Sequence, residues 1–257
     1  MTEAAAIFRA RGLSKNFGGV RAVNDISLAV APGSVLAIIG PNGAGKSTLL
    51  NLMSGIHRPD AGTMTFDDAD VTGLSTHARV RRGLARTFQK IRLFKQLSVL
   101  DNVVAGFHGH HRIPPWQYVW HGGAFRADRA RCRAQAEELL AFVGLDRRAH
   151  ALAGALAYGE QRMLEIARAL ATAPRLLLID EPAAGLNGAE VETLLDRIRV
   201  LRGRGIAVIV VEHNMDLVMN VADRVMVMDY GERLFEGTPA EVQVHPGVVA
   251  AYLGGEP

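Results

Sequence analysis

The chain has 257 residues, of which 49% are hydrophobic and 21% charged, a composition that is ordinary for a globular protein with a sizeable core. Its formal net charge of +3 is too small to indicate a nucleic-acid-binding surface, and the single cysteine, Cys132, excludes an internal disulfide. The N-terminus shows no basic and apolar leader, and the longest apolar runs fall far short of the roughly 20 residues that span a bilayer. We therefore expect a soluble protein, or one that reaches a membrane only by binding another protein.

The first segment predicts a small β region. Apolar and polar residues alternate at 7–13 and again at 25–30, a period of two that is typical of strands with one buried face. Residues 15–19 are predicted to form a turn, in which the Phe17 ring could stack on a base or pack in the core. The apolar run at 35–39 then predicts a buried strand.

A glycine-rich loop follows this strand and precedes a helix, and this context indicates a phosphate-binding loop. Its residues are Gly40, Pro41, Asn42, Gly43, Ala44, Gly45, Lys46, Ser47 and Thr48. The glycines let backbone N–H groups approach phosphate oxygens, and the helix N-terminus adds the positive end of its dipole. We expect Lys46 to reach the β- and γ-phosphates of a nucleotide and Ser47 to offer its hydroxyl to Mg²⁺.

Composition changes towards the middle of the chain. A short strand at 63–66 and a basic helix lead to a strand at 85–89 that ends in the polar residue Gln89. From 92 to about 159 the pattern is helical, with an interruption at 106–125 that is rich in Gly, Pro, His and aromatic residues. We interpret this stretch as a helical sub-domain inserted into a nucleotide-binding core.

The C-terminal part alternates predicted strands and helices. They are, in order, an amphipathic helix at 163–171, an apolar strand at 176–181, a helix at 190–202, a second apolar strand at 206–211, a strand at 225–228, a hairpin return at 231–236 and helix from 239 onward. Strands followed by helices predict an α/β fold with a mostly parallel sheet covered on both faces. The N-terminal antiparallel β region and the helical sub-domain complete this fold.

Polar residues follow three of the predicted core strands at their carboxyl ends, where ligands collect in open α/β sheets. Ser47 follows the first strand, Asp180 and Glu181 the second, and His213 the third. Asp180 would hold Mg²⁺, directly or through water, and Glu181 would take a proton from an attacking water. Gln89 could reach the metal or that water, and His213 could donate a hydrogen bond to a γ-phosphate.

In this order the motifs resemble those of the nucleotide-binding subunits of ATP-binding cassette (ABC) transporters, over nearly the whole chain. Phe17 matches the aromatic residue that stacks on adenine, Gly40 to Thr48 match the phosphate loop, and Gln89 matches the glutamine of the loop that couples to the membrane partner. Residues 156–161 match the cassette signature, Asp180 and Glu181 the second nucleotide motif with its catalytic glutamate, Leu186 and Asn187 the short loop after it, and His213 the switch histidine. The resemblance implies a Mg²⁺-dependent ATPase with one domain over 1–257, its core at about 1–91 and 160–257 and its helical sub-domain at about 92–159.

The resemblance also implies the partners. Two cassettes, identical or homologous, would sandwich ATP between the phosphate loop of one and the signature of the other. Ala157, Gly159, Glu160 and Asn187 would then face the nucleotide of the opposite cassette. The pair would dock on integral membrane permease subunits at the cytoplasmic face of the inner membrane, as a peripheral protein, with a periplasmic solute-binding protein as an indirect partner and no nucleic acid.

Finer stretches resemble one branch of this family, the ATPases of bacterial branched-chain amino acid importers. These stretches are 86–89 followed by 92–94, 181–187 and 251–254, together with the interruption at 106–125. Importers for urea and short amides share much of this pattern, so that both solute classes fit the sequence.

The signature departs from the general family pattern. The family carries Ser and then Gly where this chain has Ala157 and Tyr158, so the hydroxyl that meets the γ-phosphate of the opposite ATP is missing. The backbone N–H of Gly159 and the helix N-terminus remain as donors. Asn187 stands where many cassettes have Asp. An ATP-binding regulatory cassette with weak hydrolysis is therefore an alternative, against which the intact Glu181 and His213 count.

Overall fold

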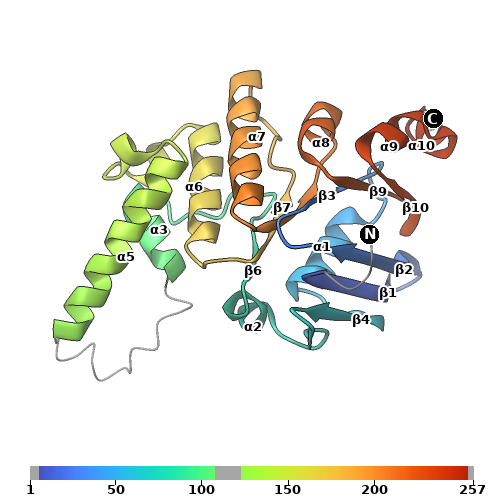
Figure 1. Cartoon of the computed structure of the whole chain (residues 1–257), viewed down its shortest axis with the longest axis horizontal. Coiled ribbons are helices and arrows are strands. Elements are labelled where there is room, and N and C mark those ends of the chain that lie inside the picture. The colour runs from blue at the N-terminus through green and yellow to red at the C-terminus, as the bar shows by residue number, and fades with distance from the viewer. Residues whose placement is uncertain (1–5, 108–122, 254–257) are drawn as a thin grey trace.

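Two β-sheets frame the molecule, which is described over residues 6–107 and 123–253 in a computed structural model. One is a four-stranded antiparallel sheet with the strand order β2-β1-β4-β5, and the other is a six-stranded sheet with the order β10-β9-β3-β8-β7-β6. Figure 1 shows helix α1 beside the antiparallel sheet and the helices α6, α7 and α8 along the other side of the molecule. The predicted α/β class with an antiparallel N-terminal region is confirmed.

The antiparallel sheet begins with a long hairpin. Its strands are β1 (Phe8–Phe17), β2 (Val20–Val30), β4 (Ala61–Phe66) and β5 (Ala69–Asp70). The predicted turn at 15–19 is wrong in its extent, because Lys15, Asn16 and Phe17 all pair with β2 and only Gly18 and Gly19 connect the strands. Gly18 supplies the positive φ, +57°, that a tight turn requires. Phe17 is therefore the last residue of a strand.

The six-stranded sheet is parallel except at one edge. Its strands are β3 (Val35–Ile39), β6 (Leu84–Arg86), β7 (Leu176–Asp180), β8 (Ala207–Val211), β9 (Arg224–Asp229) and β10 (Glu232–Gly237). Strand β10 alone runs antiparallel, beside β9. All residues of β3, β7 and β8 are buried, which is why these strands read as continuous apolar runs.

Alternate residues of the central strands enter two different cores, because successive side chains of a strand point to opposite faces. Val35, Ala37 and Ile39 of β3 pack with the helices that follow in the chain. Leu36 and Ile38 pack with α1 and the antiparallel sheet. The sheet is thus packed on both faces, by the later helices on one and by α1 with the antiparallel sheet on the other. This packing anchors the strand ends from which the loops at the carboxyl edge begin.

The helices are α1 (Lys46–Ser54), α2 (Thr76–Arg81), α3 (Val99–Gly106), α5 (Gly123–Phe142), α6 (Tyr158–Leu170), α7 (Gly188–Gly203), α8 (Met215–Val221), α9 (Pro239–Val244) and α10 (Pro246–Leu253), with short 3₁₀ turns at η3 (Asp146–Arg148) and η4 (Ala153–Ala155). Helices α3, α5 and α6 pack on one another and form one end of the molecule (Figure 1). The boundaries of the helical sub-domain stay a prediction, and most of the interruption at 106–125 lies outside the described residues. Within 6–107 and 123–253, no helix is both long enough and apolar enough to cross a bilayer.

Two element boundaries and one additional helix differ from the predictions in ways that bear on the site. Strand β6 ends at Arg86, so Gln89 lies beyond the strand and not at its end, because the backbone at 88–89 bonds to side chains of α6. Helix α6 begins at Tyr158, five residues before the predicted start, so residues 158–161 of the signature lie in its first turn. Helix α8 was not predicted; its N-cap is Asn214, whose side chain accepts from the Leu217 N–H.

Candidate functional site

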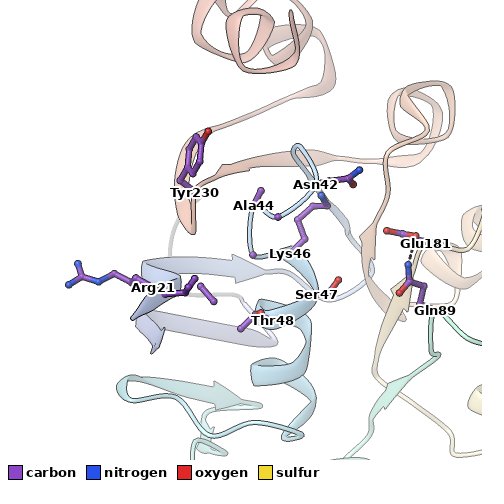
Figure 2. Close-up of a pocket in the computed structure, with 13 residues that line it drawn as sticks. Arg21, Asn42, Ala44, Lys46, Ser47, Thr48, Gln89, Glu181 and Tyr230 are labelled. Carbon is purple, nitrogen blue, oxygen red and sulfur yellow. Dashed lines mark hydrogen bonds between the residues drawn. The ribbon is translucent and has the colours of Figure 1, made fainter. Parts of the chain in front are cut away.

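A cavity of about 410 Å³ opens at the carboxyl end of β3, over the first turn of α1. It is lined by Val20, Arg21, Ala22, Asn42, Gly43, Ala44, Gly45, Lys46, Ser47, Thr48, Gln89, Glu181 and Tyr230. Figure 2 shows Arg21 and Tyr230 on one side and Gln89 with Glu181 on the other, with the glycine-rich loop between them. The predicted phosphate loop and two of the predicted catalytic residues thus meet at one place.

The loop needs glycine where it passes close to neighbouring backbone. A Cβ on Gly40 would lie 2.1 Å from the Met228 carbonyl oxygen, and one on Gly45 would lie 2.1 Å from the Ala22 carbonyl oxygen. Both glycines also have positive φ, +148° and +96°. Strands β9 and β2 therefore fix the course of the loop, and its residues 42–48 line the cavity.

Lys46 lies across the mouth of this loop and is only 8% exposed. Its ammonium group donates to the carbonyl oxygens of Gly40 and Pro41, at 2.6 and 2.8 Å. Burial lowers the pKa of Lys46 below its ordinary value, while the carboxylates of Glu181 and Asp180 oppose that shift. The cation is held where the phosphates of a nucleotide in the cavity would reach it.

Asp180 ends strand β7 and is 3% exposed. Its Oδ2 accepts a 2.9 Å hydrogen bond from Arg86, which also donates to the side chains of Asn51 and Ser54 on α1. Burial raises the pKa of Asp180, and the Arg86 guanidinium opposes the rise. The second carboxylate oxygen, Oδ1, is buried and has no hydrogen-bond partner.

That orphaned oxygen fits a hard cation such as Mg²⁺. Unpaired buried carboxylate oxygens are costly, and Mg²⁺ prefers one or two protein oxygens with phosphate and water as the remaining ligands. Ser47 lines the cavity and offers a hydroxyl. In the described part of the chain, no three His, Cys, Asp or Glu side chains cluster to hold a metal by themselves. The donor set thus suits a metal that arrives with phosphate.

Glu181 and Gln89 are hydrogen-bonded to each other on one side of the cavity. The Gln89 amide Nε2 donates to Glu181 Oε2 at 2.8 Å (Figure 2). Glu181 has a φ of +45°, an uncommon conformation for a residue with a side chain, and its N–H donates to the Val211 carbonyl of β8. This turn directs the carboxylate into the cavity as soon as β7 ends.

A buried carboxylate that the sequence did not single out supports this turn. Glu212 is fully buried, and its two oxygens accept from the backbone N–H groups of Ala183, His213 and Asn214, at 2.7 to 3.0 Å. It ties the loop after β7, which carries Glu181, to the loop after β8. In the sequence, only its position next to His213 points to Glu212.

Several predicted residues lie outside the cavity. The His213 side chain is 64% exposed, with its Nδ1 at 3.9 Å from Glu212, and it does not line the cavity. Phe17 is also absent from the lining; its ring contacts the His57 ring edge-on, at 5.3 Å between centroids. The aromatic residue that does line the cavity is Tyr230, which is 88% exposed in the turn between β9 and β10 and was not predicted.

The signature and Asn187 lie apart from the cavity, at helix N-termini. Ala157 is the N-cap of α6 and has no side-chain acceptor, while its N–H donates to the Glu160 carboxylate at 2.9 Å. Asn187 caps α7 through the Glu190 N–H. A Cβ on Gly159 would lie 2.2 Å from Glu190 Oε1, so the two helix starts are packed together.

Comparison with known proteins decides the family. Residues 23–184 match the family described as ABC transporter. The chain belongs to the ABC transporter family. Residues 232–257 also match a family described as branched-chain amino acid ATP-binding cassette transporter.

A related protein of Pseudomonas aeruginosa, the high-affinity branched-chain amino acid transport ATP-binding protein BraF, is 40% identical over 249 residues, which cover 96% of this chain and 98% of BraF. The solved ADP conformation of an ATP-binding cassette of an ABC transporter is 30% identical, with a TM-score of 0.84 over 98% of this chain and all of that chain. A dimeric cassette in a post-hydrolysis state, bound to ADP and Pi, is 26% identical, with a TM-score of 0.77 over 90% of this chain and 98% of that one.

These matches confirm the family resemblance and the fold. ABC transporter ATP-binding proteins are ATPases that bind ATP, and those of importers pair as dimers and work with membrane permease components. The match at 232–257 covers β10, α9 and α10, so it is independent of the phosphate loop.

Proposed function

We propose that this chain is the ATP-hydrolysing subunit of an importer for branched-chain amino acids. One observation supports the hydrolytic role: the hydrogen-bonded pair of Glu181 and Gln89 lines the same cavity as Lys46 and the phosphate loop. The names of the similar proteins support the solute class, since BraF is a branched-chain amino acid transport protein over nearly the same length.

ATP would lie along the cavity from Tyr230 to Glu181. The N–H groups of residues 40–48 and the Lys46 ammonium would bind its phosphates. The base would lie at the open end, beside Val20 and Tyr230, whose exposed ring offers a stacking face. Phe17, which pairs with Val20 across the hairpin, is the aromatic residue that the family resemblance favours for the same role.

Hydrolysis would need a base and a fixed water. Glu181 would accept the proton of the water that attacks the γ-phosphate, and the Gln89 amide would orient that water once its bond to Glu181 opens. Asp180 and Ser47 would hold Mg²⁺, with Gln89 within reach, and the metal would supply charge neutralisation on the phosphates. His213, in the loop tied to Glu181 by Glu212, would donate to the γ-phosphate after moving towards it.

The signature would act on the ATP of a second cassette. Ala157, Gly159, Glu160 and Asn187 lie at the starts of α6 and α7, where Ala157 and Asn187 are exposed and Gly159 is buried against Glu190. The first-turn N–H groups of a helix have no partner within the helix. Such donors suit a phosphate brought by the opposite chain. The pair would sit peripherally on permease subunits at the cytoplasmic face of the inner membrane, supplied by a periplasmic solute-binding protein.

The test is the ATPase activity of the complex reconstituted with its permease and solute-binding protein. We expect leucine, isoleucine or valine to stimulate hydrolysis, and urea or acetamide to have no effect. Stimulation by urea or acetamide alone would reject the amino acid proposal and keep the ATPase. A complex without hydrolysis, in which the chain still binds ATP, would favour the regulatory cassette instead.

A further inference from the structure

Helix α6 contains two charged side chains that are almost fully buried and that the proposed chemistry does not use. Arg162 is 0% exposed and Glu165 is 2% exposed, and they form an ion pair at 3.2 Å between Arg162 Nη1 and Glu165 Oε2. A buried ion pair seldom stabilises a fold more than apolar side chains of the same size would. We therefore look for the role of this ion pair in the other contacts that the two side chains make.

Those contacts go to the backbone of residues 88–92, here called the Gln89 segment. Arg162 donates to the carbonyl oxygens of Phe88 and Gln89, at 2.8 and 3.1 Å. Glu165 Oε1 accepts from the N–H groups of Phe88 and Arg92, at 3.3 and 3.4 Å. The segment has left strand β6 at this point, so α6 replaces the sheet as the partner of its backbone.

The same arginine reaches back to the signature. Its Nη2 donates to the Tyr158 hydroxyl at 3.2 Å, and Tyr158 is 46% exposed at the start of α6. The Tyr158 ring lies against Gly185, where an added Cβ would be 3.0 Å from its Cε1. Gly185 belongs to the loop that follows Glu181.

We propose that Arg162, held by Glu165, is a positioning residue that fixes the position of Gln89 beside Glu181. Because Arg162 also bonds Tyr158, the position of Gln89 depends on that tyrosine. The contacts run from the Tyr158 hydroxyl through the Arg162 guanidinium to the Gln89 carbonyl, and from the Gln89 amide to the Glu181 carboxylate. A second cassette that touches the exposed Tyr158 thereby shifts the catalytic side of this chain's own cavity. This inference rests on the proposed ATPase function and on hydrolysis at Glu181.

The planar guanidinium is essential to this role. It presents several N–H donors in a fixed fork, and here they bond four oxygens, on Phe88, Gln89, Tyr158 and Glu165. A lysine keeps the charge but brings all its donors to one nitrogen. Arg162→Lys thus retains the ion pair with Glu165 but loses the simultaneous hydrogen bonds of the guanidinium. This variant separates the effect of positioning from the effect of the positive charge.

The experiment is a double-mutant cycle on the ATPase activity of the reconstituted transporter, with Arg162→Lys, Gln89→Ala and both together. If Arg162 acts through Gln89, we expect Arg162→Lys to lower kcat about tenfold with KM for ATP within about twofold, and the double variant to be no slower than Gln89→Ala alone. Tyr158→Phe, which removes only the hydroxyl, should lower kcat by a smaller factor, about threefold.

The matched control is Arg79→Lys. Arg79 is also a buried arginine that donates to main-chain carbonyls, but it has no described contact with the Gln89 segment. Its acceptors are the carbonyls of Leu52, Met53, Thr72 and Leu74. We expect Arg79→Lys to lower the unfolding temperature as Arg162→Lys does, and to leave kcat unchanged.

Equal losses of kcat in both lysine variants, or rate losses that multiply in the double variant, would overturn the inference. A wild-type complex that hydrolyses no ATP would instead reject the proposed function.

Discussion

The phosphate loop and the signature are built in opposite ways. The loop is enclosed at its base: Lys46 is 8% exposed, and Gly40 and Gly45 lie against the backbone of β9 and β2. The signature is open: Tyr158 is 46% exposed, and none of residues 156–161 lines the cavity as the structure describes it. In our proposal, one half of the nucleotide site lies within this chain, and the other half would come from a second cassette.

The largest expected effect is on the enclosed half, at the proposed base. Glu181→Gln keeps the size of the side chain but replaces the oxygen that would accept a proton, so we expect kcat to fall about a thousandfold while ATP still binds. Gel filtration with ATP and Mg²⁺ should show a trapped dimer. Glu192→Gln, on the exposed face of α7, is the control. Normal turnover by the Glu181 variant would place the base elsewhere.

The next effect is on phosphate binding. Lys46→Ala removes a cation that would bond two phosphates, which costs about 3 kcal/mol, or roughly a hundredfold in affinity for ATP. Calorimetric titration with ATP measures it. Lys95→Ala, which removes an exposed ammonium group outside the cavity lining, should leave affinity for ATP unchanged. An unaltered affinity in the Lys46 variant would remove the phosphate loop from the proposal.

The open end of the cavity should contribute less. Tyr230→Ala removes a stacking face, and we expect about a tenfold loss of affinity for ATP. Affinity for inorganic triphosphate, which has no base, should stay the same. The comparison with Phe17→Ala decides between the two aromatic residues: a greater loss in the Phe17 variant would place the base on Phe17 and not on Tyr230.

The smallest effect is expected in the signature. Ala157→Ser adds an acceptor at the N-cap of α6, which should raise the free energy of unfolding by about 1 kcal/mol. A new hydroxyl facing the opposite ATP should raise hydrolysis by less than about tenfold, because backbone donors already lie there. Thermal unfolding of the subunit measures the effect on stability, and ATPase activity of the complex measures the effect on hydrolysis. A rise well above tenfold would mean that the wild-type signature lacks its main donor.

The same contrast explains what the sequence could predict. The phosphate loop lies in nine consecutive residues between a strand and a helix, so local pattern was sufficient to place Gly40 to Thr48. Gln89 and Glu181 are 92 positions apart, and only the shared sheet edge predicted that they would meet. That prediction of proximity is confirmed, although β6 ends before Gln89.

The missed residues act through long-range contacts or lie in turns. Tyr230 precedes a glycine in a hairpin, where an aromatic residue carries no periodic signal. Arg162 looks like any arginine of an amphipathic helix until the fold brings the Gln89 segment against it. The start of α6 was placed too late because Ala157 offers no capping side chain, and the capping contact comes from Glu160 instead.

Glu212 has a consequence for the motions of the site. Its carboxylate holds three amide protons from two loops, those of Ala183, His213 and Asn214. None of these amides can exchange with solvent unless its bond to that one carboxylate breaks. Hydrogen exchange should therefore show similar free energies of opening for the three amides, and Glu212→Gln should lower all three. The loop of the proposed base and the loop of His213 are then a single dynamic unit.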